Sequence, residues 1–560
     1  MKKRFTPIVS SFKQIGLLWA IFLFFPSFAN AFEMPKQPWE LDGFVRNNTA
    51  VWLESMDYVN NQDPLASFRN WFRLNLNGGF TSNLDLKAEV LAVYEPEYER
   101  EEGGGIPANE YNYFDFRELR LDWRITPLHS LRIGRQIVNW GESISARVGD
   151  VINPVDSRFD LGFTNLEDTR MPIWMIRGLH LFTSINTSLD WVFSPYIQAD
   201  RYRVNRTPSA ALTVNSDGSF TPAPRFAAYP EIRMEKLFGT RDAVIAIPGA
   251  GPGGTTLVVP GPLAGPPFSF IYQGADIFGG PTAPIDAAMA ESLFGPAFAG
   301  TPYPASGIYL TRPPVSTTDY PDSSLEDARW GFKTSSILAG WQTGVYFWHS
   351  NELSPTIRVK GGLGPIGTPL NLVVEYPKQN VYGFFANKNF SFGVLAFDVA
   401  YRPDRQYNTL DFAKYPEGIT EKDNLLAQAR LNKDLMIRSL NKYATFSLIV
   451  EYVGEFILDD LDDIHVPTYF ITYHKDSHTF LTSFSTGYRA NMYKPGVTVL
   501  YNLRGSGLIQ PEFTYTPDIL DSNLSFKLQW ANVFGDSFYE YPYGLLKDSD
   551  MLILTTQFSF

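Results

Sequence analysis

The chain contains no cysteine, which excludes disulfides, thiolate metal ligands and a cysteine nucleophile. Long hydrophobic runs are also missing. Beyond residue 31, no uninterrupted apolar stretch reaches the roughly 20 residues that a membrane-spanning helix requires. Positive charge is scarce as well, because 47 Lys+Arg stand against 59 Asp+Glu and give a formal net charge of -12. This balance argues against nucleic acid as a partner.

Motifs for cofactors and metals are missing too. The sequence has no phosphate-binding glycine loop and no histidine-glutamate metal motif, so we expect neither a cofactor nor a metal. His465, His474 and His478 lie near several aspartates without the spacing of a ligand loop, which favours a solvated acidic loop. His349 and Ser350 are neighbours on a predicted strand and point to opposite faces, which is poor geometry for proton transfer.

The first 31 residues have the three parts of a secretory signal peptide. Four cations precede an apolar run over residues 15–25, and small residues follow at 29–31. The run is too short for a spanning helix and ends at Pro26. We expect cleavage after Ala31, which leaves residues 32–560 as the exported chain.

The hairpin over residues 113–140 shows the pattern that the rest of the chain repeats. Charged and large apolar residues alternate over 118–125, which is the period of two that an extended strand turns into two faces. Aromatic residues are abundant, with 44 Phe, 29 Tyr and 12 Trp. Aromatic-rich strands of about ten residues between polar turns are typical of a transmembrane β-barrel.

Eighteen segments fit this pattern. They are 43–52, 67–80, 84–94, 113–125, 131–140, 171–182, 189–198, 328–334, 341–349, 381–388, 393–402, 425–433, 443–453, 477–488, 497–504, 508–516, 524–533 and 551–560. Sixteen is the alternative, because residues 370–376 compete with 381–388 and the link at Gly505 and Ser506 is compatible with a bulge. The sequence predicts an all-β fold, a closed antiparallel transmembrane barrel of 16–18 strands with long extracellular loops.

The connections alternate in length. Short turns fall at 81–83, 126–130 and 183–188, and long connections fall at 95–112, 141–170 and 199–327. Outer-membrane barrels carry short turns on the periplasmic side and long loops outside. We therefore expect a location in the outer membrane of a Gram-negative bacterium, with both termini periplasmic.

The final segment alternates apolar and polar residues and ends on Phe560. A C-terminal strand of this form resembles the signal that the barrel-assembly machinery recognises. That machinery and outer-membrane lipid are therefore the expected partners. An open sheet edge in lipid would leave backbone groups unpaired at a cost of several kcal/mol each, so the sheet must close.

The connection 199–327 is a Gly/Pro-rich extracellular insertion whose middle, 243–275, contains no charged residue. It cannot form a spanning helix and would be sticky if fully exposed. Residues 284–294 predict a short helix within it. Two interpretations stay open: a loop that folds over the barrel mouth for stability, or a lid over an apolar ligand.

The run over residues 133–142, IGRQIVNWGE, followed by INPVD at 152–156, resembles the signature of a proteobacterial outer-membrane family, domain of unknown function 1302. The resemblance implies a porin-like barrel linked to export or uptake of hydrophobic, lipid-like compounds, alongside an inner-membrane transporter system. It implies no catalytic residues. The candidate lumen or loop-anchoring residues of this region are Arg135, Gln136, Asn139, Trp140, Glu142, Asn153 and Asp156.

Arg135 has the strand parity of Ile133, which would direct its guanidinium to lipid at a cost of about 2–4 kcal/mol near the midplane. We expect a bulge at Gly134 that turns Arg135 inward. An ion pair with Glu142 or Asp156 would then pin the loop 141–170 inside the barrel.

Further candidates line the lumen from the preceding strand, where a row of alternating sign consists of Glu118, Arg120, Asp122 and Arg124. Such a row braces the wall and gives little ion preference. We therefore expect a non-enzymatic channel or porin-like transporter for a hydrophobic or lipid-like solute, constricted by inward-folded loops. The alternatives are an outer-membrane lipid-processing hydrolase with a rim site, and a general diffusion porin.

The alternation of connection lengths makes a topological prediction. Protease added to intact cells should cut only in the long connections, because these alone face outward. Fragment sizes on a gel measure this. Cleavage from outside within 126–130 or 183–188 would reverse the topology.

Overall fold

The computed structural model describes residues 39–53, 65–96, 112–156, 166–200, 243–247, 255–259, 314–319, 321, 323–353, 356–361, 370–409, 414–461, 474–519, 523–535 and 550–560. The predicted signal peptide, the helix predicted over 284–294 and most of the insertion 199–327 lie outside these residues. Among the helices of the described part, none is long and apolar enough to cross a membrane.

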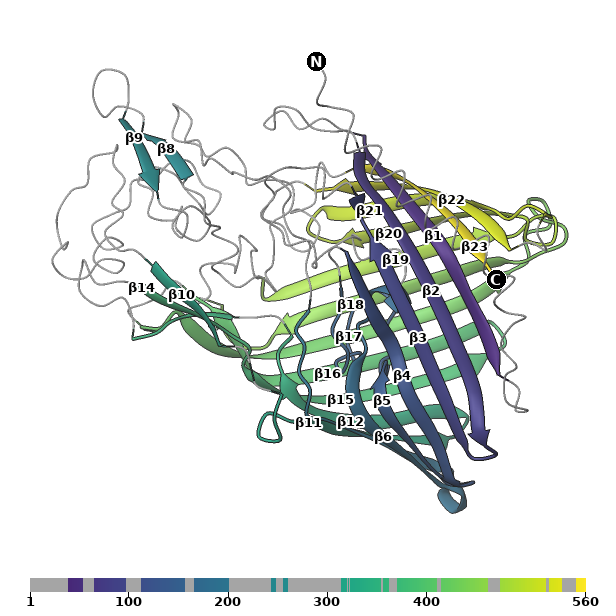
Figure 1. Ribbon diagram of the computed structural model, residues 1–560, viewed down its shortest axis with the longest axis horizontal. Coiled ribbons are helices and arrows are strands. Elements are labelled where there is room, and N and C mark those ends of the chain that lie inside the picture. Colours follow the sequence, from purple (N-terminus) through teal and green to yellow (C-terminus); the bar gives the residue numbers. More distant parts are fainter. Residues whose placement is uncertain are drawn as a thin grey trace.

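An 18-stranded antiparallel sheet closes on itself (Figure 1). Its strands are, in ring order, β1 (Glu40–Trp52), β2 (Leu65–Thr81), β3 (Leu84–Tyr94), β4 (Tyr113–Thr126), β5 (His129–Gln136), β6 (Ile173–Phe182), β7 (Thr187–Ser194), β11 (Arg329–Leu338), β12 (Trp341–Asn351), β15 (Lys378–Phe390), β16 (Gly393–Asn408), β17 (Ile419–Leu435), β18 (Phe446–Ile457), β19 (Asp476–Thr486), β20 (Tyr493–Asn502), β21 (Ser506–Tyr515), β22 (Leu524–Phe534) and β23 (Met551–Ser559). Strand β23 pairs with β1 and closes the ring. The predicted closed barrel is confirmed, with the larger of the two strand numbers.

The two rims of the ring differ in their connections. One rim, which we call the short-turn rim, carries the turns at 82–83, 127–128, 339–340 and 391–392, whereas long connections at the other rim include 95–112, 137–172 and 195–328. Glu40 pairs with Asn77, near the end of β2, so β1 begins at the short-turn rim. Phe560 bonds Gly43 and ends at the same rim.

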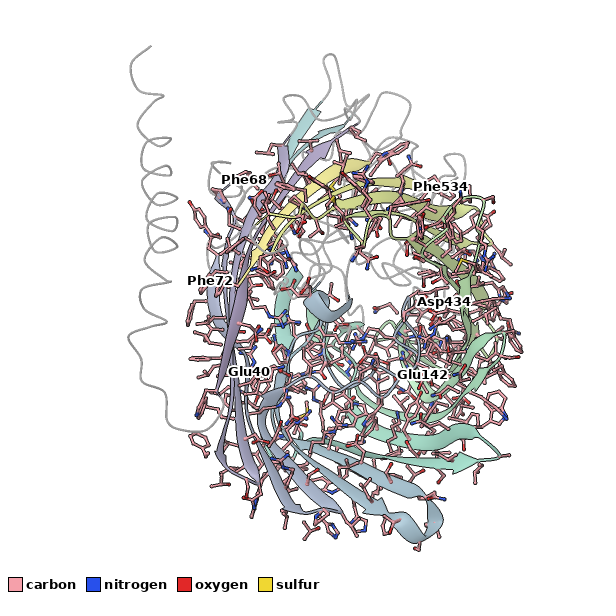
Figure 2. The ribbon with its side chains drawn as sticks, turned by 90° about the vertical axis from the view of Figure 1, so that its right-hand side faces the viewer. Glu40, Phe68, Phe72, Glu142, Asp434 and Phe534 are labelled. Carbon is pink, nitrogen blue, oxygen red and sulfur yellow. The ribbon has the colours of Figure 1, made fainter. Side chains whose placement is uncertain are left out.

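Alternation along the strands gives the barrel two chemically different faces. Large apolar side chains are exposed on the outer face, among them Trp123, Ile133, Trp174, Phe332, Phe513 and Trp530. Figure 2 shows Phe72 on this outer side of the wall. Side chains of opposite strand parity include buried polar groups such as Glu118, Asp190, Asp398 and Glu451. An apolar exterior around a polar interior is the pattern of a barrel solvated by lipid.

Smaller sheets lie apart from the ring (Figure 1). Strands β10 (Pro314–Asp319), β14 (Leu370–Glu375) and β13 (Thr356–Val359) form one, and β8 (Ala243–Ile247) pairs with β9 (Thr255–Val259). Residues 370–375 are thus extended but lie outside the barrel. The strand position for which they competed with residues 381–388 is occupied by β15. Arg358 of β13 links its sheet to the β16–β17 connection through Glu417, at 2.6 Å.

The bulge expected at Gly134 is absent, which corrects that prediction. Strand β5 stays in register with β4 and β6 through Gly134, although its φ of 134° is one that favours glycine. The extra residue lies on β4 instead, where Glu118 pairs with Glu89 and Phe116 with Val90. Between them, Arg117 is the bulged residue, and both Arg117 and Glu118 are buried.

The seam between β1 and β23 gives a prediction about assembly. Phe560 exchanges two backbone hydrogen bonds with Gly43, each 3.0 Å long, and its ring stacks on Phe72 with centroids 6.5 Å apart. Phe560→Asp places a charge on the outer face of the seam and removes the stack, so we expect less of the heat-modifiable folded form on a gel. Phe560→Tyr keeps the ring and is the control. Equal folded fractions for the two variants would contradict the prediction.

Candidate functional site

The connection between β5 and β6 leaves the wall and enters the ring. We call its described parts, residues 137–156 and 166–172, the lumen segment. Figure 2 shows Glu142 of this segment inside the ring of strands. Hydrogen bonds of its residues 140–143 reach β7, β11, β15, β16, β17 and β18. The lumen segment therefore extends from β5 to β18, on the far side of the ring in strand order.

One carboxylate holds the middle of the lumen segment. Glu451 of β18 is fully buried. It accepts hydrogen bonds from the backbone N–H groups of Ile144 at 3.0 Å and Ser145 at 2.9 Å, and from the hydroxyls of Ser143 at 2.9 Å and Ser145. Gln428 of β17 donates to the same carboxylate at 3.2 Å. Because a buried carboxylate is costly unless its oxygens are bonded, Glu451 and the segment depend on each other.

A second carboxylate, Asp398 of β16, binds the start of the segment. It accepts hydrogen bonds from the Glu142 N–H at 3.0 Å and from the Tyr346 hydroxyl at 2.9 Å. The Glu142 side chain in turn accepts from Asn387 at 2.9 Å and lies 3.6 Å from the Arg430 guanidinium. Backbone and side chain of Glu142 are thus held by three successive strands.

Small residues allow the segment to lie directly on the wall. Ala396 and Ala400 flank Asp398 on the same face of β16 and are completely buried. A Cβ added to Gly149 would lie 2.6 Å from Asp398 Oδ2 and 2.8 Å from the Tyr346 hydroxyl. The close approach therefore requires glycine at position 149.

Apolar side chains of the segment pack among its hydrogen bonds. Val138, Trp140 and Ile152 are buried in one cluster with the wall. Trp140 meets Trp348 edge to face, with centroids 5.8 Å apart, and donates from Nε1 to Asp190 at 3.1 Å. Such packing fixes the segment more tightly than hydrogen bonds alone.

The ends of the segment are joined by one amide. Asn153 accepts from the Val138 N–H at 2.7 Å and donates to the carbonyls of Gln136 at 3.2 Å and Met171 at 2.9 Å. These bonds connect the segment's exit from β5 with its entry into β6. Gln136, itself fully buried, donates to the Met175 carbonyl at 3.2 Å.

Two ion pairs complete the bracing of the lumen segment. Arg147 lies 2.8 Å from Asp200, and Arg170 lies 2.5 Å from Asp150. Both carboxylates are almost completely buried. The segment therefore has a defined shape of its own in addition to its contacts with the wall.

Arg135 does not form the expected ion pair with Glu142 or Asp156, which is a second correction. Register places Arg135 opposite Trp174, on the outward row, and its guanidinium pairs with Asp115 and donates to the Pro172 carbonyl at 3.1 Å. The strand ends one residue later, so the side chain can turn along the rim rather than through a bulge. Arg135 therefore fastens only the last residue of the lumen segment.

The remaining candidates near Arg135 have local roles. The Asp156 N–H donates to the Thr169 carbonyl at 2.6 Å. The Asn139 side chain accepts from the Gly141 N–H at 2.9 Å and is exposed. Both residues shape the backbone of the segment.

The row of alternating sign on β4 forms ion pairs with its neighbours. Their nitrogen–oxygen distances are 2.6 Å for Arg120–Glu118, 3.3 Å for Arg120–Asp122, 2.7 Å for Arg132–Asp122, 2.5 Å for Lys87–Glu118 and 3.0 Å for Arg124–Asp85. Because cation and anion alternate along this row, their fields largely cancel within the barrel.

An apolar patch interrupts this charged inner wall. Phe44, Trp71, Leu91 and Val93, from β1, β2 and β3, are buried and form one cluster, against which Tyr113 packs. These residues have the strand parity of the inward Glu89, so they face the interior. The patch is therefore a buried apolar region of the inner wall.

Sequence reasoning missed Glu451 and Asp398. Each acid has only small or apolar residues two positions away on its own face of the strand: Ala396 and Ala400 beside Asp398 on β16, and Ile449 and Val453 beside Glu451 on β18. An acid flanked in this way is a signal that something in the interior must bond it.

Three comparisons with known proteins complete the description. The model of family DUF1302, "Protein of unknown function", matches residues 114–560. No curated protein matches the sequence. Among solved structures, OccAB3 of Acinetobacter baumannii aligns with a TM-score of 0.43 and 10% identity, covering 93% of this chain and 99% of that chain. OccK3 (OpdO) of Pseudomonas aeruginosa aligns with a TM-score of 0.41 and 10% identity, covering 93% and 95% respectively.

The contacts of Glu451 predict the result of its removal. Glu451→Gln loses a charged acceptor of several hydrogen bonds, which should weaken attachment of the lumen segment by roughly 2–4 kcal/mol. We expect a larger single-channel conductance in planar lipid bilayers, because the freed segment no longer occupies a fixed part of the lumen. Arg124→Gln is the control, since its partners Asp85 and Ser82 lie at the short-turn rim. Unchanged conductance in Glu451→Gln would show that the lumen segment does not limit the pore.

Proposed function

Because this chain belongs to the DUF1302 family of proteins of unknown function, we propose a function from its own architecture. The protein is a channel in the outer membrane of a Gram-negative bacterium, and the lumen segment constricts it. The observation that carries this proposal is the segment fixed across the interior of a closed ring by Glu451 and Asp398.

The barrel supports a membrane location by its two faces. Exposed aromatic and aliphatic side chains surround it, and the ring leaves no open edge in its 18-stranded sheet. Both features are requirements of a strand structure surrounded by hydrocarbon. Short turns at one rim and long connections at the other support a periplasmic and an extracellular side respectively.

The proposed solute is hydrophobic or lipid-like. The apolar patch of Phe44, Trp71, Leu91 and Val93 supports this assignment, because it faces the interior next to the ion pairs of β3 and β4. Charges of alternating sign on β4 favour neither cations nor anions. The family resemblance further supports cooperation with an inner-membrane transporter system.

Uptake of an apolar dye tests the function. Expression in a Gram-negative strain without its major porins should accelerate the fluorescence rise of N-phenylnaphthylamine, and Glu451→Gln should accelerate it further. Liposomes containing the purified protein should swell only slowly in isosmotic sugars, since the lumen is constricted. Fast swelling without faster dye uptake would favour a general diffusion porin. Release of fatty acid from phospholipid micelles would favour the hydrolase.

A further inference from the structure

A carboxylate of the lumen segment lies on the wall beside the apolar patch. Asp168 belongs to the short helix α4 (Leu166–Thr169). Its Oδ2 lies 2.7 Å from Arg46 Nη1 and its Oδ1 lies 3.8 Å from Arg73 Nη1, while its backbone carbonyl accepts from Arg117 at 3.3 Å. Three arginines from β1, β2 and β4 thus converge on one residue that the wall itself does not supply.

Two of these arginines, Arg46 and Arg73, lie over the apolar patch. The Arg46 guanidinium carbon is 4.5 Å from the Phe44 ring centroid and 5.8 Å from that of Trp71, and the Arg73 carbon is 5.6 Å from Phe44. Cations stacked on rings remain available to bond an anion in their own plane. Positive charge and apolar side chains therefore lie next to each other on the wall.

The acids around this place are unequally attached. Glu89 is nearly fully buried and lies between Arg73 and Arg117, at 2.8 and 3.0 Å. It belongs to β3 and cannot leave. Asp168 belongs to a connection between strands. The side chains of Asp168 and Arg46 are 16% and 17% exposed to solvent. The ion pair between Arg46 and Asp168 is thus the one that can exchange with a solute.

We infer that Asp168 occupies the position of a ligand's acidic group, and that this site binds amphipathic anions. The ligand carries a carboxylate or phosphate head on a hydrocarbon body. Its head replaces the Asp168 carboxylate on Arg46 and Arg73, and its body lies on Phe44 and Trp71. The inference rests on the proposed function and narrows its solute class from hydrophobic compounds to anionic amphiphiles.

The exchange balances charge and explains why an apolar body is required. The ligand's anionic head binds as the Asp168 side chain moves into solvent. Arg46 and Arg73 are therefore paired with one anion or the other throughout the exchange. A small anion competes poorly, because a tethered carboxylate acts at an effective concentration in the millimolar range. Each methylene buried on the patch raises the affinity of the ligand roughly fourfold. Chain length should therefore decide whether displacement occurs.

Displacement also reaches the remainder of the lumen segment. Asp168 lies two positions before Arg170, whose side chain is 2.5 Å from Asp150 of the same segment. Release of α4 from the wall pulls on this ion pair and on the bond between Thr169 and Asp156. The ligand would thereby loosen the constriction that it must pass.

Equilibrium dialysis with short-chain amphiphiles tests the site. Radiolabelled octanoate and octyl phosphate are the anionic probes, and octanol and octylammonium are the neutral and cationic ones. We expect binding of the anions only, with affinity rising from butanoate to octanoate. The ratio between octanoate and octyl phosphate shows which head group is preferred. Octanol or octylammonium binding as tightly as octanoate would overturn the inference.

Variants separate the roles of the charged groups. Asp168→Asn removes the competing anion and should raise octanoate affinity roughly tenfold or more. Arg46→Gln removes the receiving cation and should lower it about tenfold. Arg132→Gln removes an arginine that is likewise paired with an acid, Asp122, and should leave affinity unchanged. Unchanged or lower affinity in Asp168→Asn refutes the assignment of Asp168 as a ligand surrogate.

Two further measurements keep the outcomes distinct. The heat-modifiable folded fraction of each variant is measured first, so that binding is expressed per folded barrel. Uptake of the dye and of radiolabelled octanoate is then measured on the same variants. Uptake without saturable octanoate binding overturns this inference and leaves the channel standing. Octanoate binding without uptake contradicts the channel and leaves the site standing.

Discussion

Every backbone N–H and C=O within a hydrocarbon layer must find its partner inside the protein, and the structure depends on this constraint. The pairing of β23 with β1 meets it, because an 18-stranded sheet with those two edges open would expose two rows of unpaired groups. Closure of the sheet then determines which side chains face outward and which face inward. One face of every strand meets lipid and the other meets the interior, so a single alternation runs through strands of very different sequence.

A ring of this size encloses more space than its own inward side chains can fill. The lumen segment occupies part of that space. Buried carboxylates on β16 and β18 accept hydrogen bonds from the backbone of the lumen segment, and small residues beside them leave room for it. The wall is thus specialised by region: acids and alanines where the segment lies, ion pairs along β4, and an apolar patch at β1 to β3.

The barrel could be predicted from sequence because alternation is local. All eighteen predicted segments became strands of the ring, with errors confined to ends such as that of β5, which stops at Gln136 when Asn153 takes over the backbone bonds. The site was predictable only as a region. Glu451 bonds residues more than three hundred positions away, and no local pattern states which inward acid will meet which loop. Arg135 was assigned the wrong partner because a bulge at Gly134 was expected to turn it inward, whereas the bulge lies on β4 at Arg117.

The separation in sequence between the lumen segment and its partners determines an order of events during folding. Glu451 follows Ser145 by 306 positions, and Gly43 and Phe560 meet from the first and last strands of the ring. Contacts of such high sequence separation form slowly, since the entropy cost of closing a long loop comes before the free energy gained from the contact. While the later strands are still arriving, the segment has no acid to receive it. Before β23 meets β1 the sheet has two open edges, and before β18 joins it the lumen segment lacks Glu451, so closure of the ring and attachment of the segment both depend on the last third of the chain.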